Sequence, residues 1–247
     1  MIIIPARLHS SRFPKKILTD ICGTPMLIKT AENAQKVDEV VIACDDSEVL
    51  EICKKYHFKA LLTNPMHTSG TDRCAEVCRI LKLKDDEIII NVQADEPFLE
   101  RKVISSLIDS MKEASFMATC AKIIDKSEIS DTNLVKVILN VHKEAIYFSR
   151  LPIPYSRDGI ENPLLQTNPY YGHLGIYGFY SQTLQEFCQL PKSPLEDIEK
   201  LEQLRAIYHK KSILIKIVQS KSIGIDTPND LQKALELISQ TQLHDSL

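Results

Sequence analysis

The sequence predicts an α/β protein with a doubly wound, mostly parallel sheet. Apolar runs alternate with helical patterns from residue 2 to residue 123, the order expected for parallel strands with right-handed crossovers. From about residue 125 to 180 the pattern changes to strands separated by short turns, which predicts an inserted antiparallel subdomain and a surface for dimerisation. The chain has no repeats, low-complexity runs or long linker, so we expect a single domain, 1–247, carrying that insertion.

The expected strands are short and rich in β-branched residues. They cover residues 2–4, 39–44, 58–62, 87–92, 117–123, 135–140, 145–148, 171–180 and 213–218. Pro5 is expected to end the first strand, and the strand at 87–92 is the most hydrophobic.

Capping residues predict where the helices begin. Pro25 is placed at the first position of one helix, and Asp45 to Ser47 begin another that runs to about Tyr56. The polar loop 64–73 opens a helix through Leu81, and a further helix covers 103–112. Ser193, Pro194 and Glu196 form a capping-box pattern that predicts one long helix to about His209, and Thr227 caps the last helix.

Composition limits the functional classes. The formal net charge is −3, which argues against a nucleic-acid partner. The seven cysteines are scattered without a CxxC pair, as in a reduced intracellular protein. No apolar run is long enough for a membrane span or a secretory signal, so a cytoplasmic protein without a membrane partner is expected.

A cationic loop follows the first strand and contains Arg7, Arg12, Lys15 and Lys16. In open α/β sheets ligands bind beyond the carboxyl ends of strands, so these cations favour a nucleoside triphosphate. The alternative is a solvated basic loop. Neither GxGxxG nor GxxxxGK[ST] is present, which argues against a nicotinamide enzyme and a P-loop ATPase.

Two aspartates are candidate magnesium ligands. Asp95 follows the most hydrophobic strand, and Asp226 lies in the turn before the last helix. Magnesium takes a few carboxylates together with phosphate oxygens and water. Each aspartate also has a structural interpretation, Asp95 as a turn former and Asp226 as a favourable charge near a helix N-terminus.

Further polar residues lie on the long helix and the aromatic strand. Glu199, Glu202 and Gln203 are expected on one helix face, where surface pairing is the alternative to a binding role. His173 lies between glycines in the strand 171–180. A lone histidine there is more often satisfied by a backbone carbonyl than catalytic.

The ordered set of motifs resembles the 3-deoxy-manno-octulosonate cytidylyltransferase (CMP-KDO synthetase) family. The resemblance covers residues 2 to about 231. Its matching segments are 4–7, 11–14 with Lys16, 69–73, 91–93 with 95–97, 147–150, 173–178, 193–196 with 201–205, and 226–228. It implies the nucleotide-diphospho-sugar transferase type of fold and a homodimer. The activity it implies is transfer of CMP from CTP to the anomeric 2-hydroxyl of KDO, with release of pyrophosphate, for lipopolysaccharide synthesis.

The resemblance also implies residue roles. The catalytic residues would be Lys16, Arg12, Asp95 and Asp226, with Mg²⁺ held by Asp95 and Asp226. The nucleotide would be bound by Pro5, Ala6, Arg7, Arg12, Lys16, Ser69 and Arg73. The sugar would be bound by Gln93, Arg150, His173, Tyr177, Glu202 and Gln203.

The chain departs from the family pattern at two positions. The family usually has glycine before the loop lysine and before the metal aspartate, where this chain has Lys15 and Ala94. Lys15 restricts the backbone of the loop, and Ala94 accepts a negative φ but not easily a positive one. The alternative functions are a cytidylyltransferase for sialic acid, another sugar nucleotidylyltransferase, and a non-catalytic nucleotide-binding protein.

Overall fold

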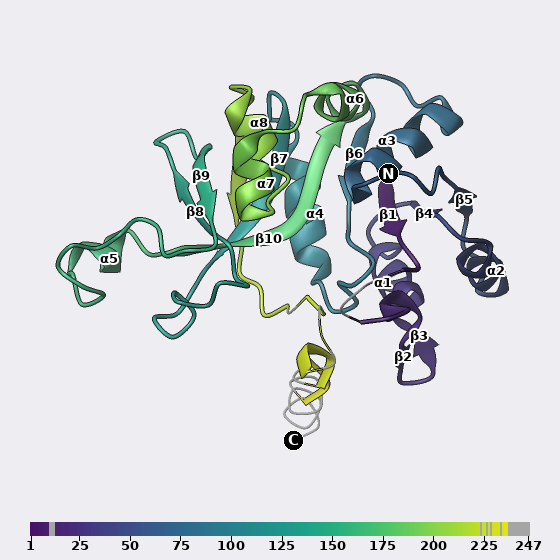
Figure 1. Ribbon diagram of the computed structural model, residues 1–247, viewed down its shortest axis with the longest axis horizontal. Helices are drawn as coiled ribbons and strands as arrows, with labels where there is room; N and C mark the ends of the chain where they lie inside the picture. The colour runs from purple at the N-terminus through teal and green to yellow at the C-terminus, as the bar shows by residue number, and fades with distance from the viewer. Residues whose placement is uncertain (10–12, 223, 226, 228, 233, 237–247) are drawn as a thin grey trace. The chain divides into compact units, whose positions relative to one another are not determined.

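A computed structural model describes residues 1–9, 13–222, 224, 225, 227, 229–232 and 234–236 (Figure 1). Its internal contacts divide the chain into two compact units, and each unit is discontinuous in sequence. Unit 1 comprises 1–82, 91–104 and the described residues from 220 onward, and unit 2 comprises 83–90 and 105–219. The expected insertion at 125–180 falls within unit 2. One domain over 1–247 stays a prediction.

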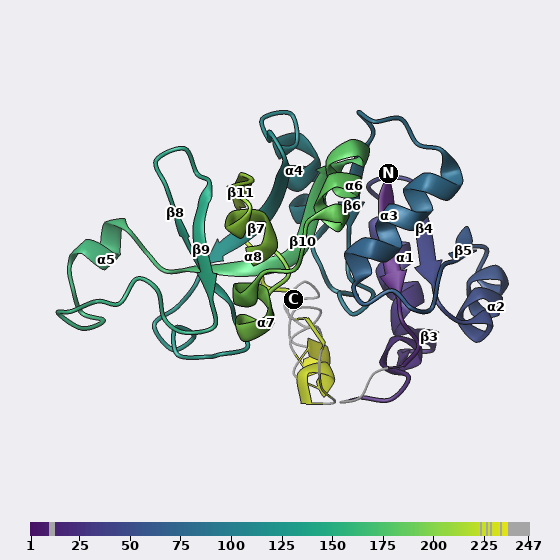
Figure 2. The ribbon, with the colours of Figure 1, turned by 45° about the horizontal axis from the view of Figure 1, so that its top comes forward.

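Unit 1 contains the parallel strands that follow the N-terminus. Strand β4 pairs with β1 on one side and with β5 on the other, both in parallel. Helices α1 and α3 both pack on β1 and β4, and α2 packs on β4 and β5 (Figure 2). The bounds are β1 Ile2–Ala6, α1 Met26–Ala34, β4 Val40–Cys44, α2 Ser47–Lys55, β5 Ala60–Leu62 and α3 Gly70–Leu81.

The strand order reverses at β1, as predicted for a doubly wound sheet. From β1 through β4 to β5 the chain moves one way across the sheet. After α3 it returns to the other side of β1, where the N–H of Val92 donates to the carbonyl of Ile3 at 3.2 Å. Right-handed crossovers then place α3 on the face opposite α1 and α2. Ligands bind at such a reversal in open sheets.

The first strand continues through Pro5 to Ala6, so the prediction that Pro5 ends it was wrong. In a parallel strand, alternate residues face the same neighbour. Ile3 faces Val92, and Pro5 therefore faces the segment after Asn91, where β6 (Ile88–Asn91) has already ended. The missing N–H of Pro5 consequently interrupts no ladder hydrogen bond.

A small hairpin replaces the turn expected before α1. After the short 3₁₀ helix η1 (Lys16–Leu18), β2 (Asp20–Ile21) pairs with β3 (Thr24–Pro25). Its two turn residues, Cys22 and Gly23, have φ values of 53° and 85°, as in the tight turns that favour hairpins. Pro25 is the N-cap of α1 instead of its first helical residue.

Unit 2 combines parallel and antiparallel pairs, which supports in part the predicted antiparallel insertion. Strand β7 pairs in parallel with β11 and antiparallel with β10. Strand β8 pairs antiparallel with β9 and β10. The bounds are β7 Met117–Ile123, β8 Lys136–Leu139, β9 Ala145–Ser149, β10 Tyr171–Tyr180 and β11 Ile213–Ile217, with short helix α5 at Leu164–Thr167.

The capping signals correctly located several helix starts. Asp46 and Ser69 accept hydrogen bonds from the N–H groups of Glu48 and Asp72 at the starts of α2 and α3. Thr227 accepts one from Asp230 before the helical residues 229–232 and 234–236. Helix α4 covers Arg101–Ser110, close to the expected 103–112. Helix α6 (Ser181–Gln189) was missed, although Leu184, Phe187 and Cys188 have helical spacing.

The single long helix predicted from Ser193 to His209 was wrong. The structure has α7 (Pro194–Glu199) and α8 (Leu204–Tyr208), separated at Lys200, whose φ is 56°. In a continuous helix residues 196 and 205 would point to opposite sides, since nine residues turn through two and a half turns. The break allows Arg205 to donate to both carboxylate oxygens of Glu196, at 2.9 and 2.6 Å.

No helix among the described residues combines the length and the apolar character needed to cross a membrane.

The Glu196–Arg205 pair yields a stability prediction. Both side chains are nearly buried, at 10% and 4% exposure. We expect Arg205→Met to lower the free energy of unfolding by about 3–5 kcal/mol, because it leaves the Glu196 carboxylate buried without its cation. Urea unfolding measures this. Lys54→Met, which removes the exposed Lys54–Glu51 pair, is the control. Equal midpoints for the two variants would refute the prediction.

Candidate active site

The loop after β1 meets the segment after β6 through one ion pair. The Nζ of Lys16 donates to Oδ2 of Asp95 at 2.5 Å, and the two side chains are 11% and 27% exposed. The cation and the carboxylate predicted for phosphate and metal binding are therefore neighbours within unit 1. Arg7 is exposed, while Pro5 and Ala6 are buried in β1. Arg12 lies outside the described residues.

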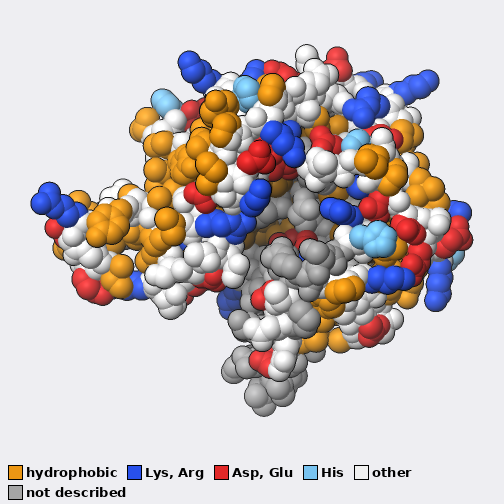
Figure 3. Space-filling model, in the orientation of Figure 1, with side chains coloured by type: hydrophobic (Ala, Val, Ile, Leu, Met, Phe, Trp, Pro, Cys, Tyr) orange, Lys and Arg blue, Asp and Glu red, His pale blue; other side chains and the backbone are white. Residues whose placement is uncertain are grey.

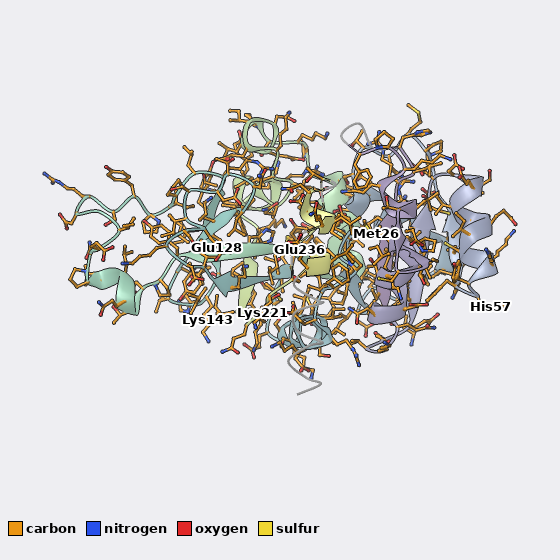
Figure 4. All side chains as sticks on the ribbon, turned by 90° about the horizontal axis from the view of Figure 1, so that it is seen from below. Met26, His57, Glu128, Lys143, Lys221 and Glu236 are labelled. Carbon is orange, nitrogen blue, oxygen red and sulfur yellow. The ribbon has the colours of Figure 1, made fainter. Side chains whose placement is uncertain are left out.

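The segment before the last helix also contacts Asp95. The N–H of Ile225 donates to the backbone carbonyl of Asp95 at 3.1 Å. The Ile225 side chain is buried in a cluster with Ile21, Ala234 and Met26, the first residue of α1, which is labelled in Figure 4. Residue 225 is therefore held beside Asp95. Asp226 itself lies outside the described residues.

Both departures from the family pattern have a definite backbone conformation. Lys15 has φ 52° and ψ 30°, in the left-handed region, where glycine is the residue without a steric cost. Its Nζ reaches both carboxylate oxygens of Glu48, at 2.7 and 2.8 Å. Ala94 is not among the described residues with positive φ. Its carbonyl accepts from the Thr30 hydroxyl at 3.0 Å.

Gly70 brings three predicted ligand residues close together. A Cβ at Gly70 would lie 2.9 Å from Cγ of Pro5 and 3.5 Å from Oε1 of Gln93. Only glycine allows the start of α3 to approach Pro5 this closely. The neighbouring Ser69 caps that helix. Pro5, Ser69 and Gln93 thus gather around one backbone position.

Arg73, predicted to contact cytosine, supports the surrounding strand ends. It is 2% exposed. Its guanidinium donates to the Thr63 hydroxyl at 2.6 Å, the Asn64 carbonyl at 3.3 Å and the Asp45 carboxylate at 3.4 Å. Asp45 also accepts from the N–H of Leu8 at 3.0 Å. Arg73 therefore stabilises the beginning of the cationic loop through Asp45, and its contact with cytosine stays a prediction.

In unit 2, a β-bulge in β10 organises His173. The pairing of β10 with β7 shifts between Leu174 and Tyr177. The Thr119 hydroxyl lies 2.6 Å from the carbonyl of Ile176 and 2.9 Å from Nε2 of His173. Because the hydroxyl has one proton and donates to the closer carbonyl, His173 donates through Nε2. Thr119 was missed in the sequence, where it is an ordinary strand residue.

His173 is buried and remains neutral over a wide pH range. Its ring packs edge-on against Phe148, with centroids 5.0 Å apart, and lies 5.6 Å from the ring of Tyr177. Burial lowers the pKa of His173 to about 3. Burial also raises the pKa of Tyr177, and the Glu202 carboxylate adds to this effect. Both rings therefore act as neutral hydrogen-bonding groups.

Gln203 has an unused donor beside these rings. Its Oε1 accepts from the Tyr177 hydroxyl at 3.1 Å. Gln203 is 3% exposed, and its Nε2 has no hydrogen-bond partner among the described residues. A buried amide donor without an acceptor costs free energy. A polar ligand at this position would satisfy it.

Glu199 anchors Arg150 instead of sharing a surface face with residues 202 and 203. The Glu199 carboxylate accepts from the Ser149 hydroxyl at 2.7 Å and from the N–H of Arg150 at 3.1 Å. The Glu199 carbonyl accepts from Nε of Arg150 at 2.8 Å. The expectation of one shared helix face was wrong, because the helix breaks at Lys200.

The structure therefore collects the predicted residues in two groups. Unit 1 contains Lys16, Asp95, Gln93 and Ser69, and unit 2 contains Arg150, His173, Tyr177, Glu202 and Gln203. Among the described residues no group of three or more His, Cys, Asp and Glu side chains is gathered for a metal ion. The Asp95 carboxylate already pairs with the Lys16 ammonium group at 2.5 Å. Its oxygens are of the kind that magnesium binds.

Residues 1–213 match the family model described as cytidylyltransferase, and the chain belongs to this family. A 3-deoxy-manno-octulosonate cytidylyltransferase from Helicobacter acinonychis (strain Sheeba) is 54% identical over 240 residues, covering 97% of this chain and 98% of that protein. The protein of the same name from Wolinella succinogenes is 52% identical over 248 residues, covering 98% and 100%. The predicted resemblance is confirmed.

A solved structure agrees with the fold. It is the CMP:2-keto-3-deoxy-manno-octonic acid synthetase complexed with CTP, with a TM-score of 0.87 and 38% sequence identity. The match covers 97% of this chain and 98% of that one. The predicted fold class is thereby confirmed for the described residues.

The low pKa of His173 predicts acid sensitivity. Between the ordinary pKa of 6.5 and about 3, the unfolded chain binds a proton at His173 that the folded chain does not. Stability is therefore lost as the pH falls through this range. The free energy of unfolding of the wild type should fall between about pH 7 and about pH 4.5. We expect the fall in His173→Gln to be smaller by roughly 2–3 kcal/mol.

Urea unfolding of both proteins at the two pH values measures this difference. The control is His142→Gln, because His142 is exposed in the β8–β9 turn and its variant should keep the wild-type pH dependence. The same loss in His173→Gln and wild type would contradict the prediction.

Proposed function

We propose that this chain transfers CMP from CTP to the anomeric 2-hydroxyl of 3-deoxy-D-manno-octulosonate, releasing pyrophosphate. The observation that carries this proposal is the 54% identity, over 97% of the chain, with a relative of that name. The product is CMP-KDO, which would serve lipopolysaccharide synthesis. A cytoplasmic location stays a prediction.

The cationic loop would neutralise the triphosphate. Lys16 would exchange its contact with Asp95 for a phosphate oxygen. Arg7, which is exposed, would add positive charge, and Arg12 would add a further positive charge. Pro5, Ala6, Ser69 and Arg73 would surround the cytosine. Positioning and charge neutralisation are the main sources of rate enhancement in phosphoryl-type transfer.

Asp95 and Asp226 would hold Mg²⁺ once Lys16 has moved to the phosphates. The bound ion would stabilise negative charge on the α-phosphate and lower the pKa of the attacking hydroxyl. Support comes from the ion pair between Lys16 and Asp95, and from the backbone hydrogen bond that holds Ile225 beside Asp95. Phosphate oxygens and water would complete the coordination.

The predicted sugar-binding residues of unit 2 would bind the sugar, and a sugar-binding role for Gln93 stays a prediction. The guanidinium of Arg150 suits the sugar carboxylate, and the buried Nε2 of Gln203 needs an acceptor, which a sugar oxygen supplies. His173 and Tyr177 would present neutral groups, and Glu202 would accept from a hydroxyl. The sugar hydroxyl oxygen then bonds to the α-phosphorus while the bond to the leaving pyrophosphate breaks, and the hydroxyl proton passes to solvent.

Pyrophosphate release distinguishes this reaction from its alternatives. The purified chain with CTP and magnesium should release pyrophosphate with KDO and at least tenfold more slowly with sialic acid or a hexose phosphate. Turnover only with the other sugars would favour another nucleotidylyltransferase. CTP binding without turnover on any of them would favour a non-catalytic binding protein.

Asp95→Ala tests the metal role. We expect turnover to fall by at least a thousandfold in protein that circular dichroism shows to be folded, because the α-phosphate loses its metal. Asp109→Ala is the matched control, since Asp109 is exposed on α4 and pairs with Lys112. Its turnover should equal that of the wild type. Magnesium-dependent turnover retained in Asp95→Ala would remove this residue from the mechanism.

We also propose that the chain forms a homodimer through the β8–β9 side of unit 2. Several large apolar side chains are exposed there, and hydrophobic side chains gather over β8, β9 and α5 in Figure 3. They are Val141, Ile146, Leu151, Tyr155, Ile160 and Leu164. Exposed apolar surface of this kind commonly marks a protein–protein interface.

Light scattering tests the dimer. The wild type should have the mass of two chains, and Ile146→Lys should shift the mass toward one chain because it places a charge on the apolar surface. Met66→Lys is the control, since Met66 is an 80% exposed apolar residue of unit 1. A monomeric wild type would contradict the proposal.

A further inference from the structure

Lys136 is a fully buried lysine that no part of the proposed mechanism uses. It opens β8 and has 0% exposure. Burial lowers the pKa of its ammonium group, and the nearby Arg150 adds to this effect, against the opposing carboxylates of Asp131 and Glu199. Such a group is costly to bury unless each of its protons has an acceptor. The structure supplies those acceptors.

All three ammonium protons of Lys136 are directed at backbone carbonyls. Nζ donates to the carbonyls of Asp131 at 2.7 Å, Leu134 at 2.6 Å and Arg150 at 2.6 Å. A lysine has three donors and no acceptor, so this arrangement uses its whole capacity. It joins the segment before β8 to the residue that follows β9.

Arg150 is held by the same segment through its side chain. Its Nη1 donates to the carbonyl of Thr132 at 3.1 Å, and its Nε donates to the carbonyl of Glu199 at 2.8 Å. Thr132 lies between Asp131 and Leu134, whose carbonyls Lys136 binds. Lys136 therefore fixes both the main chain of Arg150 and the acceptor that orients its guanidinium.

The remaining donors of Arg150 are available for an anion. Among the described residues Nη2 has no hydrogen-bond acceptor, while Nε and Nη1 each have one. A half-buried guanidinium fixed through Nε and Nη1 presents Nη2 in a defined direction, where it can donate to a carboxylate.

We propose that Lys136 is a positioning residue that orients Arg150 to bind the carboxylate of the acidic sugar. This inference rests on the proposed function. Lys136 touches neither substrate and acts through the three carbonyls that it gathers. Its loss should therefore weaken the use of the sugar and leave the use of CTP unchanged.

Steady-state kinetics of Lys136→Met test the proposal. We expect the KM for KDO to rise roughly tenfold to a hundredfold, the range for losing a hydrogen bond to a charged group, with the KM for CTP unchanged and kcat within about threefold. Lys122→Met is the control, because Lys122 is a partly buried lysine of the same unit that pairs with Glu128, labelled in Figure 4. It should keep the wild-type KM for KDO.

A double-mutant cycle separates positioning from a general structural effect. If Lys136 acts through Arg150, then Lys136→Met combined with Arg150→Met should have the KM for KDO of Arg150→Met alone, because the two effects are not independent. Independent effects that multiply would overturn the proposal, as would equal changes in the KM values for KDO and CTP.

If Lys136→Met does not fold, Lys136→Arg serves with the same readouts. A longer, planar guanidinium cannot reproduce three contacts of 2.6–2.7 Å, so the Arg150 carbonyl must shift and the KM for KDO should still rise. An unchanged KM in Lys136→Arg would overturn the proposal. Absence of wild-type turnover with CTP and KDO would instead count against the proposed function.

Discussion

A carboxylate beyond the end of an apolar strand needs a cation nearby, and the contact between Lys16 and Asp95 meets this need. It joins the loop after β1 to the segment after β6, on the two sides of the point where the strand order reverses. The other features of unit 1 follow from keeping these two segments together. Arg73 and Asp45 hold the beginning of the loop, and Ile225 holds the backbone of Asp95 from a third segment.

In unit 2 the polar groups are held by backbone irregularities. At the bulge in β10 the Thr119 hydroxyl donates to the carbonyl of Ile176, and its oxygen accepts a hydrogen bond from Nε2 of His173. The break at Lys200 allows Arg205 to reach Glu196. Each irregularity interrupts regular hydrogen bonding, and a buried side chain compensates at that point. These contacts keep the mostly buried polar side chains of unit 2 in a defined orientation.

Features of the fold that are set by residues close together in the sequence were predicted correctly. The alternation of strands and helices, the caps at Asp46 and Ser69 and the cation-rich loop were all readable from the sequence. The break at Lys200 was not, because it depends on a pair nine residues apart and on a lysine in a left-handed conformation, which has no sequence signature. The position of Pro5 inside β1 was also not readable, because it depends on where β6, which is distant in the sequence, ends.

The candidate site was predictable to a similar extent. The family resemblance assigned Lys16 to the phosphates and Asp95 to the metal, and the structure brings these two side chains together. The role of Arg150 in sugar binding stays a prediction, and the residues that support these side chains were not predicted. Thr119 and Lys136 resemble ordinary strand residues in the sequence, and only the three-dimensional structure shows that their polar atoms serve His173 and Arg150. Supporting residues lack a motif because their partners are mostly backbone atoms, which every sequence provides.

The left-handed lysine at position 15 has a consequence for the solution behaviour of the cationic loop. A side chain in this backbone conformation costs about 1–2 kcal/mol relative to glycine, and the contact with Glu48 offsets part of this cost. Both partners are about half exposed, so dissolved ions screen their attraction. The stability of the backbone conformation at Lys15 should therefore depend on ionic strength, whereas with glycine at this position it would not.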